Sequence, residues 1–478
     1  MSALGRLQRA LAETLVRSGL DTSDDILILS AFLHDFRWSD RRASAAELAE
    51  DWRDLLAKPP PGHFLNLYLH FPFCAEKCLF CLYASRVPPG ARTIGAYVEQ
   101  AQAEIEHHAR VFDGAKFRTF AAGGGTPSLL SAGDLERFYA PVFAGFRFED
   151  DAFISIECSP STVDAEKLRV LRGLGFSRIS FGVQSLDAKV LRSVRRGSQR
   201  TEMVEAAVRG ARGAGFEDVN LDLLFGLLGD GTESFLESFR GVARLRPTTI
   251  QVCGLSLTDG YVRANRISRP DFYRRYAALL PAALEGMRRE ASAAGYVPDG
   301  LGPEKGVWAF VAQETPRATF KRWMRKEPHG RSPCSFIGLG EGGRSHVFGR
   351  AHHLRCSGAF DPAAGLYCRA PLTTKEEMAL YLFYSFETSG RVRLNRFREH
   401  FGVELRDAMA LEVDILLALG ALRSAPGGFR FTPAAQTSRI FHGLVLILDA
   451  AGASPHSSGR IDAELLRGVR RELEGVHA

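Results

Sequence analysis

The feature of this sequence that most constrains its fold is a regular alternation of strand-like and helix-like segments between residues 64 and 255. Six short apolar segments are typical of buried strands, and each except the last is followed by an amphipathic segment typical of a helix. The predicted strands are 64–71, 117–123, 152–158, 178–184, 218–226 and 248–257. This alternation predicts an α/β protein with parallel strands and crossover helices. Because six units are too few for a closed eight-stranded barrel, a partial, open (β/α)6 barrel fits best.

Three cysteines follow the first predicted strand. Cys74, Cys78 and Cys81 have the spacing C-x3-C-x2-C on one short loop. Three thiolates on such a loop can bind three irons of a [4Fe-4S] cluster, for which thiolate is the usual ligand. A zinc site is the alternative, but zinc usually takes four ligands in paired halves and no second cysteine pair follows. A cluster with three protein ligands keeps one iron open to a substrate or cofactor, so the spacing predicts a catalytic cluster.

Glycine and polar residues stand near the carboxyl ends of the later predicted strands, where parallel barrels gather their functional groups. A glycine run lets a backbone approach a ligand closely, although taken alone it also fits a tight turn. A carboxylate can pair with an ammonium group, an amide can bind hydroxyls, and a guanidinium can hold a carboxylate. Together these residues predict one pocket for a zwitterionic amino-acid group. They are Gly124, Gly125, Thr126, Glu157, Gln184, Arg196 and Asp222.

The remaining segments suggest a modular organisation. Residues 300–370 are rich in arginine, glycine and histidine and are predicted to be irregular, while GGFRFTP near residue 430 resembles the wing of a winged-helix unit. We expect five parts: an N-terminal helical extension and linker (1–62), the partial barrel (63–260), a barrel completion with a substrate-facing insertion (261–371), a C-terminal helical domain (372–450) and a helical tail (451–478).

Composition excludes several classes of protein. The net charge is +6 over 478 residues, without the focused basic stripe of a nucleic-acid-binding face. No run of 18 apolar residues could span a membrane, and the N-terminus lacks the apolar core of a secretory signal. We therefore expect a cytoplasmic protein with no nucleic-acid or membrane partner. A reducing compartment also suits five scattered cysteines that we expect to be buried free thiols: Cys158, Cys253, Cys334, Cys356 and Cys368.

These motifs resemble those of the radical S-adenosylmethionine (SAM) enzymes, in the branch of oxygen-independent coproporphyrinogen III dehydrogenase. The matching segments are YLHFPFCAEKCLFC, GGGTPS, IECSP, RISFGVQSLD, DLLFG, GLGEGGRSHVFG and LTTKEEMALYLFYSFETSGRV. The resemblance covers about residues 64–450. It implies a partial (β/α)6 radical SAM barrel followed by a helical, winged-helix-like C-terminal domain.

The resemblance also implies roles for the candidate residues. Cys74, Cys78 and Cys81 would hold the cluster, whose open iron would bind the amino and carboxylate groups of SAM. Gly124, Gly125 and Thr126 would contact the methionine portion, Glu157 and Arg196 its charged ends, and Gln184 and Asp222 the ribose or neighbouring groups. Tyr68, near the cluster, is the candidate catalytic residue. Flavodoxin or ferredoxin would supply the electron that cleaves SAM.

Two departures from the branch bear on the substrate. Tyr83 stands where the dehydrogenases carry a further cysteine, and the 300–370 region has a different sequence. We expect His346, His352 and His353 in that region to face the substrate, or else to be ordinary surface residues. We expect a small-molecule substrate that is aromatic, tetrapyrrole or a natural product, with methyl or methylene transfer from a second SAM molecule. The alternatives are oxidative decarboxylation of coproporphyrinogen III and delivery of heme by a chaperone.

Overall fold

The structure is a computed structural model that describes residues 42–298, 307–316, 333–418 and 420–432. The predicted tail at 451–478 and most of the N-terminal extension lie outside these residues. The described part of the extension contains helix α3 (Ala45–Ala57). The side chain of Ser44 accepts a hydrogen bond from the Glu47 amide at 3.3 Å, and the Glu47 carboxylate accepts one from the Ser44 amide at 2.7 Å. This reciprocal cap fixes the start of the helix.

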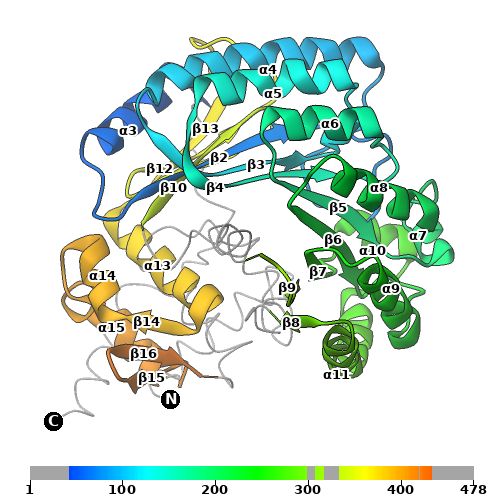
Figure 1. The fold of residues 1–478 in the computed structure, drawn as a ribbon. Coiled ribbons are helices and arrows are strands. Elements are labelled where there is room, and N and C mark those ends of the chain that lie inside the picture. The colour runs from blue at the N-terminus through cyan, green and yellow to red at the C-terminus, as the bar shows by residue number, and fades with distance from the viewer. Residues whose placement is uncertain (1–41, 299–306, 317–332, 419, 433–478) are drawn as a thin grey trace.

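The six predicted strand–helix units are confirmed. Strands β2 to β7 run parallel in chain order, each paired with the next, and helices α4, α5, α6 and α8 lie along the outer side of the curved sheet (Figure 1). The elements are β2 (Phe64–Phe71), α4 (Ala91–Val111), β3 (Lys116–Gly124), α5 (Ala132–Gly145), β4 (Arg147–Cys158), α6 (Ala165–Leu174), β5 (Arg178–Gln184), α7 (Ala188–Ser193), α8 (Thr201–Gly213), β6 (Asp218–Phe225), α9 (Thr232–Arg244) and β7 (Thr249–Gly254).

Apolar stripes explain how these helices attach to the sheet. In α9, Phe235, Phe239 and Val242 recur at helical spacing and are each 1% exposed or less. Helices cover one face of the strands, and the other face lines the barrel interior (Figure 1). Full burial of such a side chain contributes about 1.5–3 kcal/mol, so this layer is the main source of stability.

The sheet extends beyond the six predicted strands on both sides. Its order is β1-β13-β12-β11-β10-β2-β3-β4-β5-β6-β7-β9-β8. Strand β10 is parallel to β2 and the remaining added strands are antiparallel to their neighbours. The added elements are β1 (Arg42–Ala43), α10 (Asp259–Asn265), α11 (Arg269–Ala293), β8 (Tyr296–Pro298), β9 (Val307–Ala312), β10 (Cys334–Leu339), β11 (Arg344–Val347), β12 (Ala351–Arg355) and β13 (Tyr367–Pro371).

The prediction of irregular structure at 300–370 was therefore wrong for the described residues. His346, His352 and His353 lie on β11 and β12 with exposures of 3%, 7% and 1%, so they are not surface residues. The His346 ring bonds the carboxylate of Glu377 at 2.9 Å, and the His353 ring bonds that of Asp51 at 3.0 Å. Because these histidines are paired with carboxylates, they can be buried in strands. The strands therefore lack the apolar pattern from which strands are predicted.

The C-terminal module has the predicted winged-helix-like form. Helices α13 (Thr374–Ser389), α14 (Leu394–Phe401) and α15 (Leu405–Ala418) accompany an antiparallel sheet in the order β14-β16-β15. Its strands are β14 (Arg391–Arg393), β15 (Leu422–Ala425) and β16 (Gly428–Phe431), so the GGFRFTP segment supplies the expected wing. None of the helices in the described ranges is both long enough and apolar enough to cross a lipid bilayer.

Candidate active site

The cysteine loop leaves the carboxyl end of β2 and is closed at its base. The Arg86 amide donates to the Pro72 carbonyl at 2.8 Å, and the Cys74 amide donates to the Arg86 carbonyl at 3.0 Å. A further bond from the Leu79 amide to the Val194 carbonyl at 3.2 Å ties the loop to the segment after α7. The loop is therefore fixed from two sides of the barrel.

The three thiols lie where a cluster could be held. Cys74 is buried and Cys78 and Cys81 are partly buried. Thr126 Oγ1 lies 3.4 Å from the sulfur of Cys74, and Arg196 Nη1 lies 3.6 Å from that of Cys78. Burial raises the pKa of the Cys78 thiol, as do the neighbouring thiols, whereas Arg196 lowers it.

The arrangement of these donors favours a cluster over a single metal ion. A tetrahedral zinc would draw its sulfurs to about 3.8 Å from one another. A cubane cluster instead binds each thiolate through a different iron, which suits three cysteines spread along one loop. The donor set therefore fits a cluster with one iron free of protein ligands.

The glycine run packs against the cysteine loop. The amides of Gly125 and Thr126 donate to the carbonyls of Phe71 at 2.6 Å and Phe73 at 2.7 Å. A Cβ on Gly125 would lie 2.4 Å from the Phe73 oxygen, and one on Gly124, where φ is +108°, would lie 2.5 Å from the His70 ring. Two loop amides thus serve the protein itself, and the direct SAM contacts expected of this run stay a prediction.

Glu157 stands at the end of β4 and is accessible from the barrel interior. Desolvation by the surrounding barrel and the nearby charge of Asp222 raise the pKa of Glu157 to about 7, while a hydrogen bond from the Gly124 amide lowers it. A Cβ on Gly123 would lie 2.6 Å from its Oε2 atom. The structure therefore joins Glu157, the glycine run and Asp222 in one place, and a cation bound there would favour the carboxylate form.

Asp222 is held by a polar ladder inside the barrel. Ser180 Oγ donates to its Oδ2 atom at 2.7 Å, and Asn220 Nδ2 donates to its Oδ1 atom at 2.6 Å. The amide oxygen of Asn220 in turn accepts a bond from the Thr249 hydroxyl at 2.6 Å. These bonds offset the cost of placing a carboxylate in a largely apolar strand.

Arg196 and Gln184 meet at the end of β5. The Arg196 guanidinium donates to the Gly182 carbonyl and to the Ser159 hydroxyl, the latter at 3.3 Å. Gln184 has a φ of +69°, which is uncommon for a residue other than glycine, and the β5–β6 register shifts between Gly182 and Gln184. A non-glycine residue in this region costs about 1–3 kcal/mol and often marks a functional position.

Tyr68 lies on β2, the strand that precedes the cysteine loop. Its hydroxyl is 3.0 Å from His70 Nδ1, and His70 Nε2 is 2.7 Å from the Ala84 carbonyl. Because a carbonyl can only accept, Nε2 carries the proton, Nδ1 accepts, and the Tyr68 hydroxyl donates to it. Burial and the charge of Glu157 raise the pKa of Tyr68, so it is a neutral phenol that directs an oxygen lone pair into the site.

Two residues with no predicted role also support the site. Arg86, at the base of the cysteine loop, makes a two-pronged contact with the Glu341 carboxylate, one arm of which is 2.8 Å. Ser357 donates to the same carboxylate at 2.7 Å. Glu341 falls inside the quoted GLGEGG motif, which was the available signal. Its partner is 255 residues earlier, so the pair could not be recognised without the fold.

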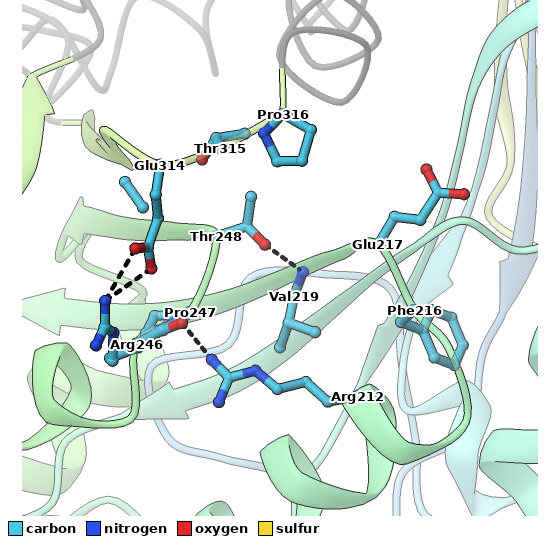
Figure 2. A pocket seen from close by; sticks show the side chains of 11 residues that line it. Arg212, Phe216, Glu217, Val219, Arg246, Pro247, Thr248, Glu314, Thr315 and Pro316 are labelled. Atoms are coloured by element: carbon cyan, nitrogen blue, oxygen red, sulfur yellow. Dashed lines mark hydrogen bonds and ion pairs between the residues drawn. The ribbon is translucent and has the colours of Figure 1, made fainter.

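A pocket of about 290 Å³ lies at the opposite ends of β6 and β7 (Figure 2). Its charged groups are already paired, since Arg246 bonds Glu314 at 2.9 Å and Arg212 donates to the Leu245 carbonyl at 2.8 Å. The candidate site residues lie at the carboxyl ends of the strands, so this pocket is not part of the candidate site.

Comparisons with known proteins agree with this arrangement. The sequence model of the radical SAM superfamily matches residues 68–241. Oxygen-independent coproporphyrinogen III oxidase of Escherichia coli is 36% identical over 192 residues, which are 40% of this chain and 42% of that protein. The heme chaperone HemW of the same organism is 33% identical over 40% of this chain and 50% of that protein.

The solved structure of coproporphyrinogen III oxidase (HemN) from Escherichia coli matches with a TM-score of 0.70 and 22% identity. The match covers 90% of this chain and 99% of that one, and it establishes the shared fold. In sequence, the chain spans half or less of the length of these two curated relatives. The chain therefore contains a radical SAM domain, its sequence is similar to proteins named coproporphyrinogen III oxidase and heme chaperone, and it shares the fold of HemN.

Proposed function

We propose that this chain is a radical SAM enzyme that acts on a small molecule. Proteins of this superfamily use a [4Fe-4S] cluster and SAM. The observation that carries the proposal is the set of three thiols without a fourth protein ligand, next to a carboxylate and a guanidinium at the strand ends. When bound, the cluster supplies the electron that cleaves SAM into methionine and a 5′-deoxyadenosyl radical, which then takes hydrogen from the substrate.

The residues of the chain have three tasks in this proposal. Cys74, Cys78 and Cys81 hold the cluster and keep it partly shielded from water. Arg196 places a positive charge beside Cys78, where the carboxylate of SAM would lie. Glu157 faces the same space and suits the ammonium group.

Asp222, Gln184 and Tyr68 complete the proposed pocket. Asp222 is held by Ser180 and Asn220, and its carboxylate is the kind of group that accepts hydrogen bonds from hydroxyls such as those of ribose. Gln184 is constrained by its backbone beside Gly182. Tyr68 offers an acceptor oxygen rather than a proton, because its own proton is engaged by His70. We therefore propose that Tyr68 positions ligands and keeps the cluster edge dry.

The substrate and reaction follow less directly. The relatives named coproporphyrinogen III oxidase favour a tetrapyrrole substrate and oxidative decarboxylation. Against that, Tyr83 replaces the extra cysteine and its side chain is 59% exposed. Methyl or methylene transfer from a second SAM molecule, the reaction expected from the sequence, has no support from these relatives and becomes the alternative. Heme delivery is a second candidate function, favoured by the similarity to the heme chaperone.

One experiment separates these outcomes. The protein is purified and reconstituted anaerobically, then given SAM, dithionite and coproporphyrinogen III, and the products are quantified by mass spectrometry. Deoxyadenosine with loss of carbon dioxide supports decarboxylation, and deoxyadenosine with S-adenosylhomocysteine supports methyl transfer. Heme is added to a parallel sample, and stable heme binding without SAM cleavage in either sample would show that the enzyme proposal is wrong. Cys78→Ser should abolish product, whereas Cys368→Ser, outside the loop, should not.

A further inference from the structure

Two cysteines outside the cluster loop lie in contact. Cys368 is on β13 and is the register partner of Leu354 on the antiparallel strand β12. Cys356 directly follows β12, and its amide continues the ladder by donating to the Leu366 carbonyl at 2.8 Å. Because alternate residues share a face, Cys356 and Cys368 are diagonal neighbours on one side of the sheet. Their sulfur atoms are 3.3 Å apart.

An arginine adjoins both sulfurs. Arg42 on β1 is the register partner of Cys368, and its Nη1 atom contacts the sulfurs of both Cys368 and Cys356. A guanidinium in this position favours the thiolate form that attacks disulfides. Both cysteines are partly exposed and Arg42 is exposed, so a small reagent can reach them.

The environments of two other free thiols are different. Burial raises the pKa of Cys158 and of Cys253 to about 12, so both are protonated and unreactive at neutral pH. Burial and the neighbouring Cys356 also raise the pKa of Cys368, but Arg42 lowers it. Reaction at Cys368 should therefore accelerate as the pH rises above neutrality.

We propose that Cys356 and Cys368 form a reversible disulfide in the folded chain by exchange with low-molecular-weight disulfides. One thiolate attacks the reagent, forms a mixed disulfide and releases one thiolate of the reagent. The second cysteine, after losing its proton to solvent, displaces the remaining thiolate and closes the bond. The protein loses two electrons, and the reagent gains them as two thiols.

The geometry requires little movement for closure. The sulfurs must approach from 3.3 Å to about 2.05 Å, which side-chain rotation can supply. The site is also connected to the cysteine loop, because Ser357 follows Cys356 and donates to the Glu341 carboxylate that binds Arg86. The cysteine pair therefore lies next to the Glu341–Arg86 contact that anchors the cysteine loop. The proposal does not depend on the proposed enzymatic function.

Oxidised glutathione provides the test. Anaerobically reconstituted full-length protein is incubated with it, alkylated in denaturant and digested with trypsin, which leaves both cysteines in the single peptide 356–369. We expect this peptide to lose both alkyl labels and two hydrogens, and to regain the labels after reduction by dithiothreitol. In Cys356→Ser, Cys368 should keep a glutathione adduct because its resolving partner is gone.

The control is Cys253→Ser, which should leave closure unchanged. Arg42→Gln should slow closure while leaving the circular dichroism spectrum of the protein intact. Two results would overturn the proposal: both cysteines remaining fully alkylated in the folded protein, or closure at the same rate in folded and urea-unfolded chains.

Discussion

Gly125 allows the sharpest test of how the site is assembled. In Gly125→Ala, the new methyl carbon would lie 2.4 Å from the Phe73 carbonyl oxygen and 2.8 Å from that of Phe71. Ordinary contact begins at 3.4 Å, so the cysteine loop or the glycine run must retreat by about 1 Å, at a cost of about 1–3 kcal/mol. The two hydrogen bonds that join these segments would lengthen or break.

The effect on activity should exceed the effect on stability. A misplacement of about 1 Å in reacting groups can lower a rate about 100-fold, and we expect a loss of that size in deoxyadenosine formation from SAM. Bound iron per chain and the thermal midpoint should also fall. Gly133→Ala is the matched control, because a Cβ there would meet nothing within 4 Å and alanine suits helix α5. Wild-type iron content and SAM cleavage in Gly125→Ala would refute the packing argument.

Three further predictions concern charged groups. Burial raises the pKa of Asp51, but hydrogen bonds from a histidine and an arginine lower it, and the resulting pKa is about 2. The stabilisation is present above pH 4 and is lost as the pH falls toward 2. Asp51→Asn should therefore cost about 2 kcal/mol at neutral pH by thermal unfolding, while the exposed Asp54→Asn should cost under about 0.5 kcal/mol; equal costs would contradict this. In a double-mutant cycle, Arg86→Gln and Glu341→Gln should show a coupling energy of about 1 kcal/mol in the free energy of unfolding. Each single variant should also lose its cluster faster than the wild-type protein. Additive effects on stability would show that the ion pair does not anchor the loop. The pKa of Glu157 is raised to about 7, so SAM binding measured by calorimetry should tighten several-fold from pH 6 to pH 8. Glu157→Gln should abolish this pH dependence. The same pH profile in the variant and the wild-type protein would show that Glu157 does not contact SAM.

Local pattern was sufficient to predict the barrel but not its flanks. The strands between residues 64 and 255 are rich in apolar residues, and each is separated from the next by an amphipathic helix, so the order and direction of the strands could be predicted. Strands β11 and β12 could not, because their buried histidines depend on Asp51 and Glu377, which come from other elements.

The candidate site divides in the same way. Three cysteines on one loop are recognised from spacing alone. The pairing of Asp222 with Ser180 on the neighbouring strand, and the convergence of Glu157 with the glycine run, require the parallel register of the sheet. The packing of Gly125 against the cysteine loop could not be predicted either. The sequence does not show whether a glycine amide faces a ligand or bonds another part of the chain.

The central claim is that Cys74, Cys78 and Cys81 hold a cluster whose remaining iron binds SAM. The most direct measurement is anaerobic iron and sulfide analysis of the reconstituted chain, combined with electron paramagnetic resonance of the reduced protein before and after SAM is added. We predict about four irons and four sulfides per chain and a cluster signal that shifts when SAM binds. A single bound metal without sulfide, or a full cluster whose signal does not respond to SAM, would contradict the account.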